Sequence, residues 1–186
     1  NTTEKLFTFN FKEFMPPTIV TKNVHEIQNF LDKFDEIITK PLYGNGGVGI
    51  HRFNNQNFNP DILEQYLDLP IMVQKYIKEI DQGDRRLILI DGEYCGSVAR
   101  IPKDGDIKAN FHAGGIPKKT DLVFRDKEII DVVGPQLVKN NLFFVGIDII
   151  GDFLTEINVT SPTGIKQINK LNNVNLEKVF WDKLEA

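Results

Sequence analysis

The sequence predicts an α+β protein built from two lobes of mostly antiparallel sheet with helices. Two pairs of strand-like apolar runs are each joined by a short Asp-Gly or Gly-Asp segment, a pattern typical of β-hairpins. The pairs are Arg85–Ile90 with Tyr94–Ile101, and Phe143–Ile150 with Phe153–Val159. Helical patterns do not alternate regularly with these strands, which argues against a parallel sheet of βαβ units.

The other elements lie on both sides of a polar link at Lys78–Asp84, which we take as the boundary between a first lobe, residues 1–78, and a second, residues 79–186. Apolar residues at helical spacing predict helices at Thr21–Phe34, Asn59–Leu67, Asp121–Lys139, Gly164–Leu171 and Leu176–Leu184. Compact apolar runs predict further strands at Glu36–Leu42, Ile50–Phe53 and Ile71–Ile77. Thr21 or Asn23 can cap the first helix.

Composition excludes several classes of function. A net charge of -4 and a sequence pI near 5.4 argue against a nucleic-acid-binding protein, which needs a basic surface. No apolar run reaches the length of a membrane span, and the first residues lack a signal-peptide pattern. Cys95 is the single cysteine and cannot form an internal disulfide. We therefore expect a cytoplasmic protein without membrane or nucleic-acid partners.

The hairpin near the C-terminus carries the most informative side chains. Glu156 and Asn158 are two residues apart on a strand, so both leave the same face. Asp148 joins that face if a three-residue loop is centred on Asp152, whereas a two-residue turn would direct it away. Two carboxylates and an amide form an oxygen-only site suited to Mg²⁺, so the metal interpretation predicts the three-residue loop. The alternative interpretation is a solvated face of an edge hairpin.

A glycine-rich segment, Gly44–Gly49, lies between two predicted strands. Successive glycines expose backbone N–H groups that can surround phosphate oxygens. The spacing matches neither the P-loop nor the Rossmann pattern. Lys40 ends the preceding strand and can add a point charge on the phosphates. A flexible hairpin turn and a surface lysine are the alternatives.

Longer strings in the same region resemble a known family. Asp148–Asp152 reads DIIGD and Leu154–Thr163 reads LTEINVTSPT, which is similar to the C-terminal signature of bacterial glutathione synthetases. Other strings of that family occur in its order, at Glu4–Phe7, Lys40–Leu42, Gly83–Arg86, Ala99–Pro102, Asn110 and Ala113–Gly115. The late string is specific to the family, whereas the glycine segment alone is weak. The resemblance implies an ATP-grasp fold with a nucleotide between the lobes.

The same resemblance implies a ligase of glutathione biosynthesis. ATP, with Mg²⁺ or Mn²⁺, would drive the joining of glycine to γ-glutamylcysteine through an acyl phosphate. By resemblance, Asp148, Glu156 and Asn158 would be the metal ligands, and Ser161 and Thr163 would contact substrate. The residues implied for ATP are Lys5, Lys40, Gly44, Gly46, Gly47, Gln74, Lys75, Tyr76, Ile77 and Asp84.

Arg86 and Arg100 are candidates for clamping the transferring phosphoryl group and the substrate carboxylate, because phosphoryl transfer needs neutralising charge and alignment. The alternative is two outward arginines in ion pairs. Their relative direction depends on the loop between the strands. A tight Asp91–Gly92 turn would place them on opposite faces, whereas a loop centred on Glu93 would align them.

The segment Pro102–Lys119 is predicted to be a long loop. It resembles the family's lid, which closes over the acyl phosphate, and Asn110 is its catalytic candidate. The family carries an N-terminal domain before the point where this sequence begins, and its full-length members are expected to be homo-oligomers. The resemblance leaves the activity of this portion alone open. A nucleotide-binding fragment and another ATP-grasp carboxylate–amine ligase are the alternatives.

Overall fold

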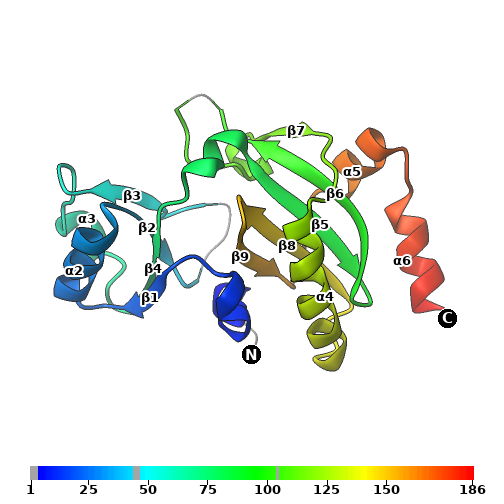
Figure 1. The fold of residues 1–186 in the computed structure, drawn as a ribbon, viewed down its shortest axis with the longest axis horizontal. Helices are drawn as coiled ribbons and strands as arrows, with labels where there is room; N and C mark the ends of the chain where they lie inside the picture. The colour runs from blue at the N-terminus through cyan, green and yellow to red at the C-terminus, as the bar shows by residue number, and fades with distance from the viewer. Residues whose placement is uncertain (1–3, 44–46, 104) are drawn as a thin grey trace.

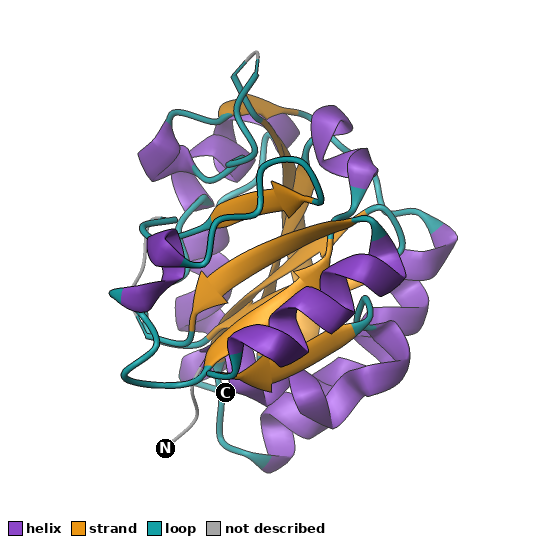
Figure 2. Ribbon diagram, turned by 90° about the vertical axis from the view of Figure 1, so that its left-hand side faces the viewer, coloured by secondary structure: helices purple, strands orange, loops and turns teal. Residues whose placement is uncertain are grey.

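The structure of the chain, a computed structural model, describes residues 4–43, 47–103 and 105–186. It contains a four-stranded sheet and a five-stranded sheet, and all strand pairs of these described residues are antiparallel. The two sheets lie side by side in Figure 1, and the view of Figure 2 shows the strands in the middle with helices around them. Within these ranges no helix is long and apolar enough to cross a membrane.

The first sheet has the strand order β1-β4-β2-β3. Its elements are β1 (Thr18–Thr21), β2 (Glu36–Pro41), β3 (His51–Asn54) and β4 (Ile71–Lys75), with helices α2 (Val24–Phe34) and α3 (Asp61–Glu64). Helix α2 begins where the side chain of Asn23 accepts the N–H of His25 at 2.9 Å. Its apolar face buries Ile27 and Leu31 in one cluster with Ile37 of β2, so the helix covers one face of this sheet.

The second sheet has the order β7-β6-β5-β8-β9. Its strands are β5 (Asp84–Ile90), β6 (Glu93–Ile101), β7 (Ile116–Lys118), β8 (Phe144–Ile150) and β9 (Phe153–Asn158). The remaining elements are α1 (Glu4–Phe7), α4 (Phe124–Lys139), α5 (Ile165–Asn172), α6 (Leu176–Leu184) and the 3₁₀ helices η1 (Thr8–Phe14), η2 (Lys78–Gln82) and η3 (Phe111–Ala113).

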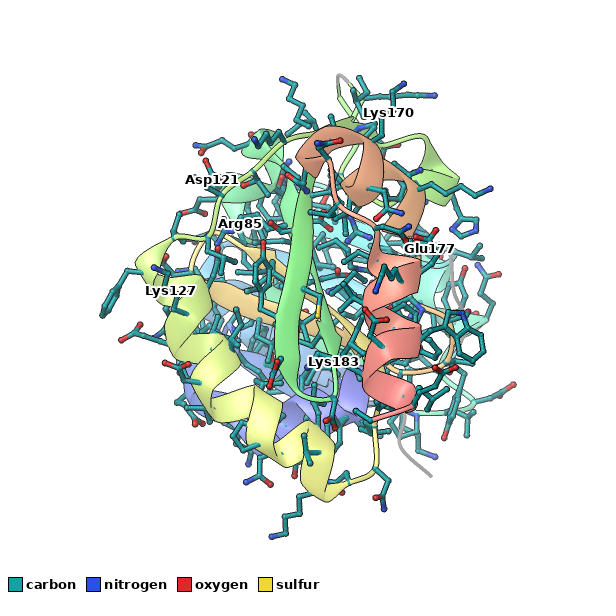
Figure 3. All side chains as sticks on the ribbon, turned by 90° about the vertical axis from the view of Figure 1, so that its right-hand side faces the viewer. Arg85, Asp121, Lys127, Lys170, Glu177 and Lys183 are labelled. Carbon is teal, nitrogen blue, oxygen red and sulfur yellow. The ribbon has the colours of Figure 1, made fainter. Side chains whose placement is uncertain are left out.

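The two faces of the second sheet differ. One face is largely apolar and packs against α4 and η1. The other face is divided: Ile88, Ile90 and Val98 pack against Ile168 of α5 and Leu176 at the start of α6, while the rest of it is polar. Figure 3 shows α4 and α6 on either side of strands β5 and β6. The helices thus leave one part of the polar face uncovered, where the two sheets meet.

The loop of the β8–β9 hairpin differs from the predicted one. Ile150 pairs with Phe153, so the turn contains only Gly151–Asp152, and the predicted three-residue loop is wrong. Asp148 nevertheless pairs with Glu156. The pairing that the metal interpretation requires is therefore present, for a reason that the sequence prediction did not include.

That reason is a register shift on β9, where Thr155 is an extra residue in a β-bulge. In an unbulged hairpin Glu156 would lie opposite Ile147, which is completely buried in the apolar core. Burying that carboxylate unpaired would cost several kcal/mol, whereas a bulge forfeits a ladder hydrogen bond worth about 1 kcal/mol. Leu154 and Ile157, three residues apart, are both buried in this same core, which only a bulged strand allows.

The β5–β6 hairpin corrects its prediction in the same way. Its turn is the tight Asp91–Gly92 turn, which was expected to separate the two arginines. A register shift leaves Cys95 as an extra residue on β6. Arg86 therefore lies opposite Val98, whereas without the shift it would lie opposite Ser97. Arg86 and Arg100 consequently share one face of the sheet.

Several short elements were not predicted. Strand β1 precedes the first long helix, which begins at Val24 and not at Thr21. Strand β7 lies inside the segment predicted to be a loop; it is a three-residue edge strand, and its Pro117 is tolerated there because an edge position does not need every ladder donor. Helix α3 is shorter than the predicted Asn59–Leu67. These elements are short, so their local patterns are weak.

Arg85, labelled in Figure 3, connects helix α4 to the turn of the β8–β9 hairpin. Its guanidinium binds the completely buried Asp126 at 2.7 and 3.0 Å and donates to the carbonyl oxygen of Gly151 at 2.8 Å. Asp126 also accepts the N–H of Val123 at 3.1 Å, which caps the helix. The turn of the hairpin is therefore held from the apolar side of the sheet.

Candidate functional site

A cavity of about 770 Å³ lies between the two sheets. Strands β2 and β4 line it from the first sheet, and strands β5, β6, β8 and β9 line it from the second. The α1 segment, the loop before η3 and residues 160–163 complete the wall. Its volume lies within the range of about 300–1,000 Å³ that small-molecule sites occupy.

The structure brings almost all of the predicted site residues to this cavity. Those that line it are Lys5, Lys40, Gly47, Gln74, Lys75, Tyr76, Ile77, Asp84, Arg86, Arg100, Asn110, Asp148, Glu156, Asn158, Ser161 and Thr163. Gly44 and Gly46 lie outside the described residues. The convergence is strong because these positions are distributed over more than 150 residues of sequence.

Two arginines and two aspartates form a buried network on the polar face of the second sheet. Arg86 binds Asp148 through both of its carboxylate oxygens, with Nη2 donating to Oδ2 at 2.7 Å. Arg100 donates from Nε to Asp84 at 2.7 Å and from Nη2 to Asp148 at 3.0 Å. Only 2% of Arg100 is exposed. The arginines therefore point inward, and their charges are balanced within the network.

Burial and charge act in opposite directions on these groups. Burial opposes the ionisation of Asp148, but the charges of Arg100 and Arg86 outweigh it and hold its pKa at about 2. Burial raises the pKa of Asp84, against the charge of Arg100, because that guanidinium is shared with Asp148. The pKa of Arg100 is raised because the two aspartates outweigh its own desolvation.

Glu156 and Asn158 extend this polar face onto β9. Asn158 lies opposite Gly146, and its amide nitrogen donates to Asp148 Oδ2 at 3.2 Å and to the carbonyl oxygen of Gly146 at 3.3 Å. Lys5 places its ammonium 4.0 Å from a Glu156 carboxylate oxygen. In the described part of the chain no three His, Cys, Asp or Glu side chains are arranged to hold a metal. A cation site here would use two carboxylates and an amide.

Lys40 faces this wall from the first sheet. Burial lowers the pKa of its ammonium, and the charge of Glu156 is the strongest opposing influence. Lys5 adds a second positive charge nearby, which lowers the pKa of Lys40 further. The cavity therefore concentrates lysine charge next to carboxylates, an arrangement suited to a ligand that carries both phosphates and a cation.

An apolar pocket in the same cavity was missed by the sequence prediction. Tyr76, Ile80 and Ala109 are buried in a small cluster, with Ile38 and Ile150 packed against them. The missed strand residues could have been found from alternation, because Ile38 is two residues from Lys40 on β2 and Ile150 is two residues from Asp148 on β8. Side chains two apart on a strand share a face.

The segment leaving β4 has much of its hydrogen-bonding capacity in use. The side chain of Gln74 is buried and donates to Thr18 Oγ1 at 3.0 Å. The N–H of Lys75 donates to the carbonyl of Pro17 at 3.0 Å, and that of Tyr76 to the carbonyl of Glu36 at 2.9 Å. These bonds fix the C-terminal end of β4 at the cavity wall.

The loop before η3 crosses from the second sheet to the glycine segment of the first. Asn110 caps η3 by accepting the N–H of Ala113 at 2.9 Å. A Cβ placed on Gly47, where φ is +80°, would lie 3.1 Å from the Asn110 amide nitrogen and from Lys108 Cδ. Glycine permits this close approach, so the two loops that border the cavity touch each other there.

The chain has many relatives of known function. Residues 4–173 match the family model described as prokaryotic glutathione synthetase, ATP-grasp domain. The chain is 43% identical over 190 residues to the glutathione synthetase of Brucella melitensis biotype 1, covering 100% of this chain and 61% of that protein. It is 42% identical to the glutathione synthetase of Synechococcus elongatus, covering 98% of this chain and 58% of that protein. The chain thus spans about 60% of the length of the curated relatives that it matches.

Solved structures share its fold. The ATP-grasp ligase PsnB superposes with a TM-score of 0.72 at 16% identity, covering 99% of this chain and 58% of that chain. D-alanine–D-alanine ligase from Bacillus anthracis gives a TM-score of 0.68 at 16% identity, covering 98% of this chain and 66% of that chain. These likenesses confirm the predicted α+β ATP-grasp fold, and together with the family-model match and the curated relatives they place the chain as a member of the prokaryotic glutathione synthetase ATP-grasp domain family.

Proposed function

We propose that this chain binds ATP together with Mg²⁺ in the cavity between its sheets, as the ATP-grasp part of an enzyme that joins glycine to γ-glutamylcysteine. One observation carries the proposal. Oxygen donors from β8 and β9 stand beside arginines from β5 and β6 on one wall of the cavity, and Lys40 faces them from the other. Membership of the family supplies the class of reaction, ligation of a carboxylate to an amine with ATP.

The adenine base fits the apolar pocket formed around Tyr76, Ile38 and Ile150. Because the N–H groups of Lys75 and Tyr76 already donate to backbone carbonyls, Ile77 is the residue of this segment whose N–H the base edge would meet. A ribose hydroxyl at Asp84 would share that carboxylate with Arg100. Each assignment agrees with the sequence prediction and refines the atoms involved.

The phosphates would lie toward Lys5, Lys40 and the glycine segment, close to the oxygen donors of the second sheet. Mg²⁺ or Mn²⁺ would be held by Asp148, Glu156 and the amide oxygen of Asn158, an all-oxygen set that suits a hard cation. Asp148 is already paired with two arginines, so Glu156 supplies the less compensated charge. A bound cation would neutralise phosphate charge during the transfer.

In the proposed reaction the cysteinyl carboxylate of γ-glutamylcysteine attacks the γ-phosphorus of ATP, which releases ADP and gives an acyl phosphate. The amine of glycine then attacks the acyl carbon, and phosphate leaves. Arg86 donates to the carbonyl oxygen of Thr163 at 3.1 Å and also binds Asp148. It thus connects the segment with Ser161 and Thr163, proposed to contact substrate, to one of the proposed cation ligands. The loop carrying Asn110 would exclude water from the acyl phosphate.

We further propose that residues 1–78 and 79–186 act as two lobes that close on the nucleotide. The ligation itself is proposed for the protein that contains this chain, because the chain spans only about 60% of its curated relatives. The full-length protein would be a homo-oligomer. A reducing, cytoplasmic location suits the free thiol of Cys95 and a thiol substrate.

Two measurements test this function. Calorimetric titration of the chain with a non-hydrolysable ATP analogue should show binding that Mg²⁺ strengthens. Phosphate release should then require both γ-glutamylcysteine and glycine, with D-alanine dipeptide formation as the control reaction. If the protein that contains this chain binds ATP but shows no turnover with both substrates, the ligase proposal is contradicted. An absence of ATP binding by either would contradict the nucleotide site.

A further inference from the structure

We propose that Thr155 is a positioning residue, whose hydroxyl fixes the carboxylates of Asp148 and Glu156 in the geometry that a divalent cation needs. The inference rests on the proposed function, because it concerns the same cation site. Thr155 was not among the predicted site residues, and it acts through its neighbours rather than as a ligand.

The first step is the register of the hairpin. Because Thr155 is the extra residue of the bulge, Glu156 stands opposite Asp148 and Asn158 opposite Gly146. Without the extra residue, strand alternation would place Glu156 opposite Ile147, on the apolar face of the sheet. The cation donors therefore share one face only because a residue is inserted at position 155.

The second step is the contact that the inserted residue makes. Thr155 Oγ1 donates to the backbone carbonyl oxygen of Asp148 at 3.1 Å. The residue is only 4% exposed, and it lines the cavity beside Glu156 although the two are adjacent in sequence. Consecutive residues of an ordinary strand point to opposite faces. The hydroxyl thus fastens the bulge directly to the residue that carries one carboxylate and lies opposite the other.

The third step separates the hydroxyl from the bulge itself. Leu154 and Ile157 both belong to the apolar core, so the pattern of large apolar residues keeps the bulge whatever stands at position 155. Valine has the shape of threonine without the hydroxyl. Thr155→Val should therefore keep the fold and the register while releasing the bond to Asp148, which isolates the positioning effect.

The test uses Mn²⁺ as the probe, with its free concentration measured by electron paramagnetic resonance during titration of the protein saturated with a non-hydrolysable ATP analogue. Groups that orient metal ligands typically change metal affinity about 10–100-fold when they are removed. We expect Thr155→Val to weaken Mn²⁺ binding about tenfold, while affinity for the analogue without cation stays unchanged. Thr155→Ser, which keeps the hydroxyl, should restore binding to near the unmodified level.

Thr39→Val is the matched control. Thr39 is also a buried strand threonine, with 1% exposure, and among the described residues its Oγ1 meets no hydrogen-bond partner. Its replacement should leave Mn²⁺ affinity unchanged. If the unmodified chain binds Mn²⁺ and Thr155→Val binds it equally well, the role of Thr155 is refuted while the cation site stands. If the unmodified chain binds no Mn²⁺, both the cation site and the role of Thr155 are refuted.

Discussion

The two hairpins of the second sheet share one geometry, but their bulge residues lie in different surroundings. Each has a two-residue turn, and each carries one bulge that brings its polar residues to the cavity face. In β5–β6 the bulge residue is Cys95, which lies near the turn and packs with the cluster under α5 and α6. In β8–β9 the bulge residue is Thr155, which lies within the cavity wall and bonds to Asp148.

The charges of the two hairpins differ as well. The arginines of β5–β6 are deeply buried and fully engaged with Asp84 and Asp148, so this hairpin acts as a charged support. On β9, Glu156 is more exposed, and its ion pair with Lys5 is a long one of 4.0 Å. The β5–β6 hairpin therefore stabilises the site through buried ion pairs, whereas the β8–β9 hairpin carries the more exposed carboxylate that a ligand can reach.

Replacing the residue that joins the two hairpins should have the largest effect. Asp148→Asn leaves Arg86 and Arg100 facing a neutral amide in a buried position. We expect a loss of about 3 kcal/mol in the free energy of unfolding, since breaking a buried pair leaves uncompensated charge. Urea denaturation at neutral pH measures it. A change below about 1 kcal/mol would mean that the network is not a support.

The stability difference between the unmodified chain and Asp148→Asn should also depend on pH. The pKa of Asp148 falls from its usual 3.8 to about 2 in the folded chain. This shift corresponds to a contribution of about 2 kcal/mol to the free energy of unfolding. This contribution is present above about pH 4 and is lost as pH falls through 2. Asp84 shares Arg100 with Asp148, and its raised pKa changes in the opposite sense, so both chains are compared with Asp84→Asn also present. A gap that stays constant between pH 5 and 2 would refute the assignment.

Glu156→Gln should separate binding from support. Glu156 is partly exposed and its ion pair with Lys5 is a long one, so unfolding free energy should change by less than about 1 kcal/mol. Mn²⁺ affinity should fall at least about tenfold, because an anionic ligand becomes a neutral one. The opposite pattern, a clear loss of stability with unchanged Mn²⁺ affinity, would reverse the roles assigned to the two hairpins.

Cys95→Ala should have the smallest effect. Cys95 is half-buried, and its thiol donates to the carbonyl of Glu93 at 3.4 Å. Because this bulge is remote from the donors, Mn²⁺ affinity should stay unchanged and stability should fall by no more than about 1 kcal/mol. An effect on Mn²⁺ binding as large as that of Thr155→Val would remove the distinction between the two bulges.

The sequence predicted the major strands and helices because their apolar patterns are long and consistent. It also identified most of the polar residues that line the cavity, although most of those assignments came from family strings rather than from chemistry. The polar lining residues that it did not identify are Glu4, Lys108, His112, Thr155 and Thr160. Strand β7 was missed because three residues are too few to show a period. Strand β1, which is as short as the predicted β3, lies directly before helix α2, and its last residue, Thr21, was assigned to that helix. The apolar pocket was not predicted, although Ile38 shares a strand face with Lys40 and Ile150 shares one with Asp148.

The two β-bulges were not predicted from the sequence. A regular hairpin can bring Asp148 opposite Glu156 only through a three-residue loop, whereas the structure does so with a two-residue turn and a bulge. The signal was present in Leu154 and Ile157: two core residues at odd spacing on one strand imply an inserted residue. The ion-pair partners of Arg86 and Arg100 could not be predicted from the sequence, because those partners come from other strands.

A crystal structure of the chain with Mg²⁺ and a non-hydrolysable ATP analogue tests the central claim most directly. The account predicts a cation within about 2.0–2.1 Å of oxygen atoms from Asp148, Glu156 and Asn158, with the base beside Tyr76 between the two sheets. A cation bound away from the β8–β9 hairpin, or a nucleotide bound outside this cavity, would contradict it.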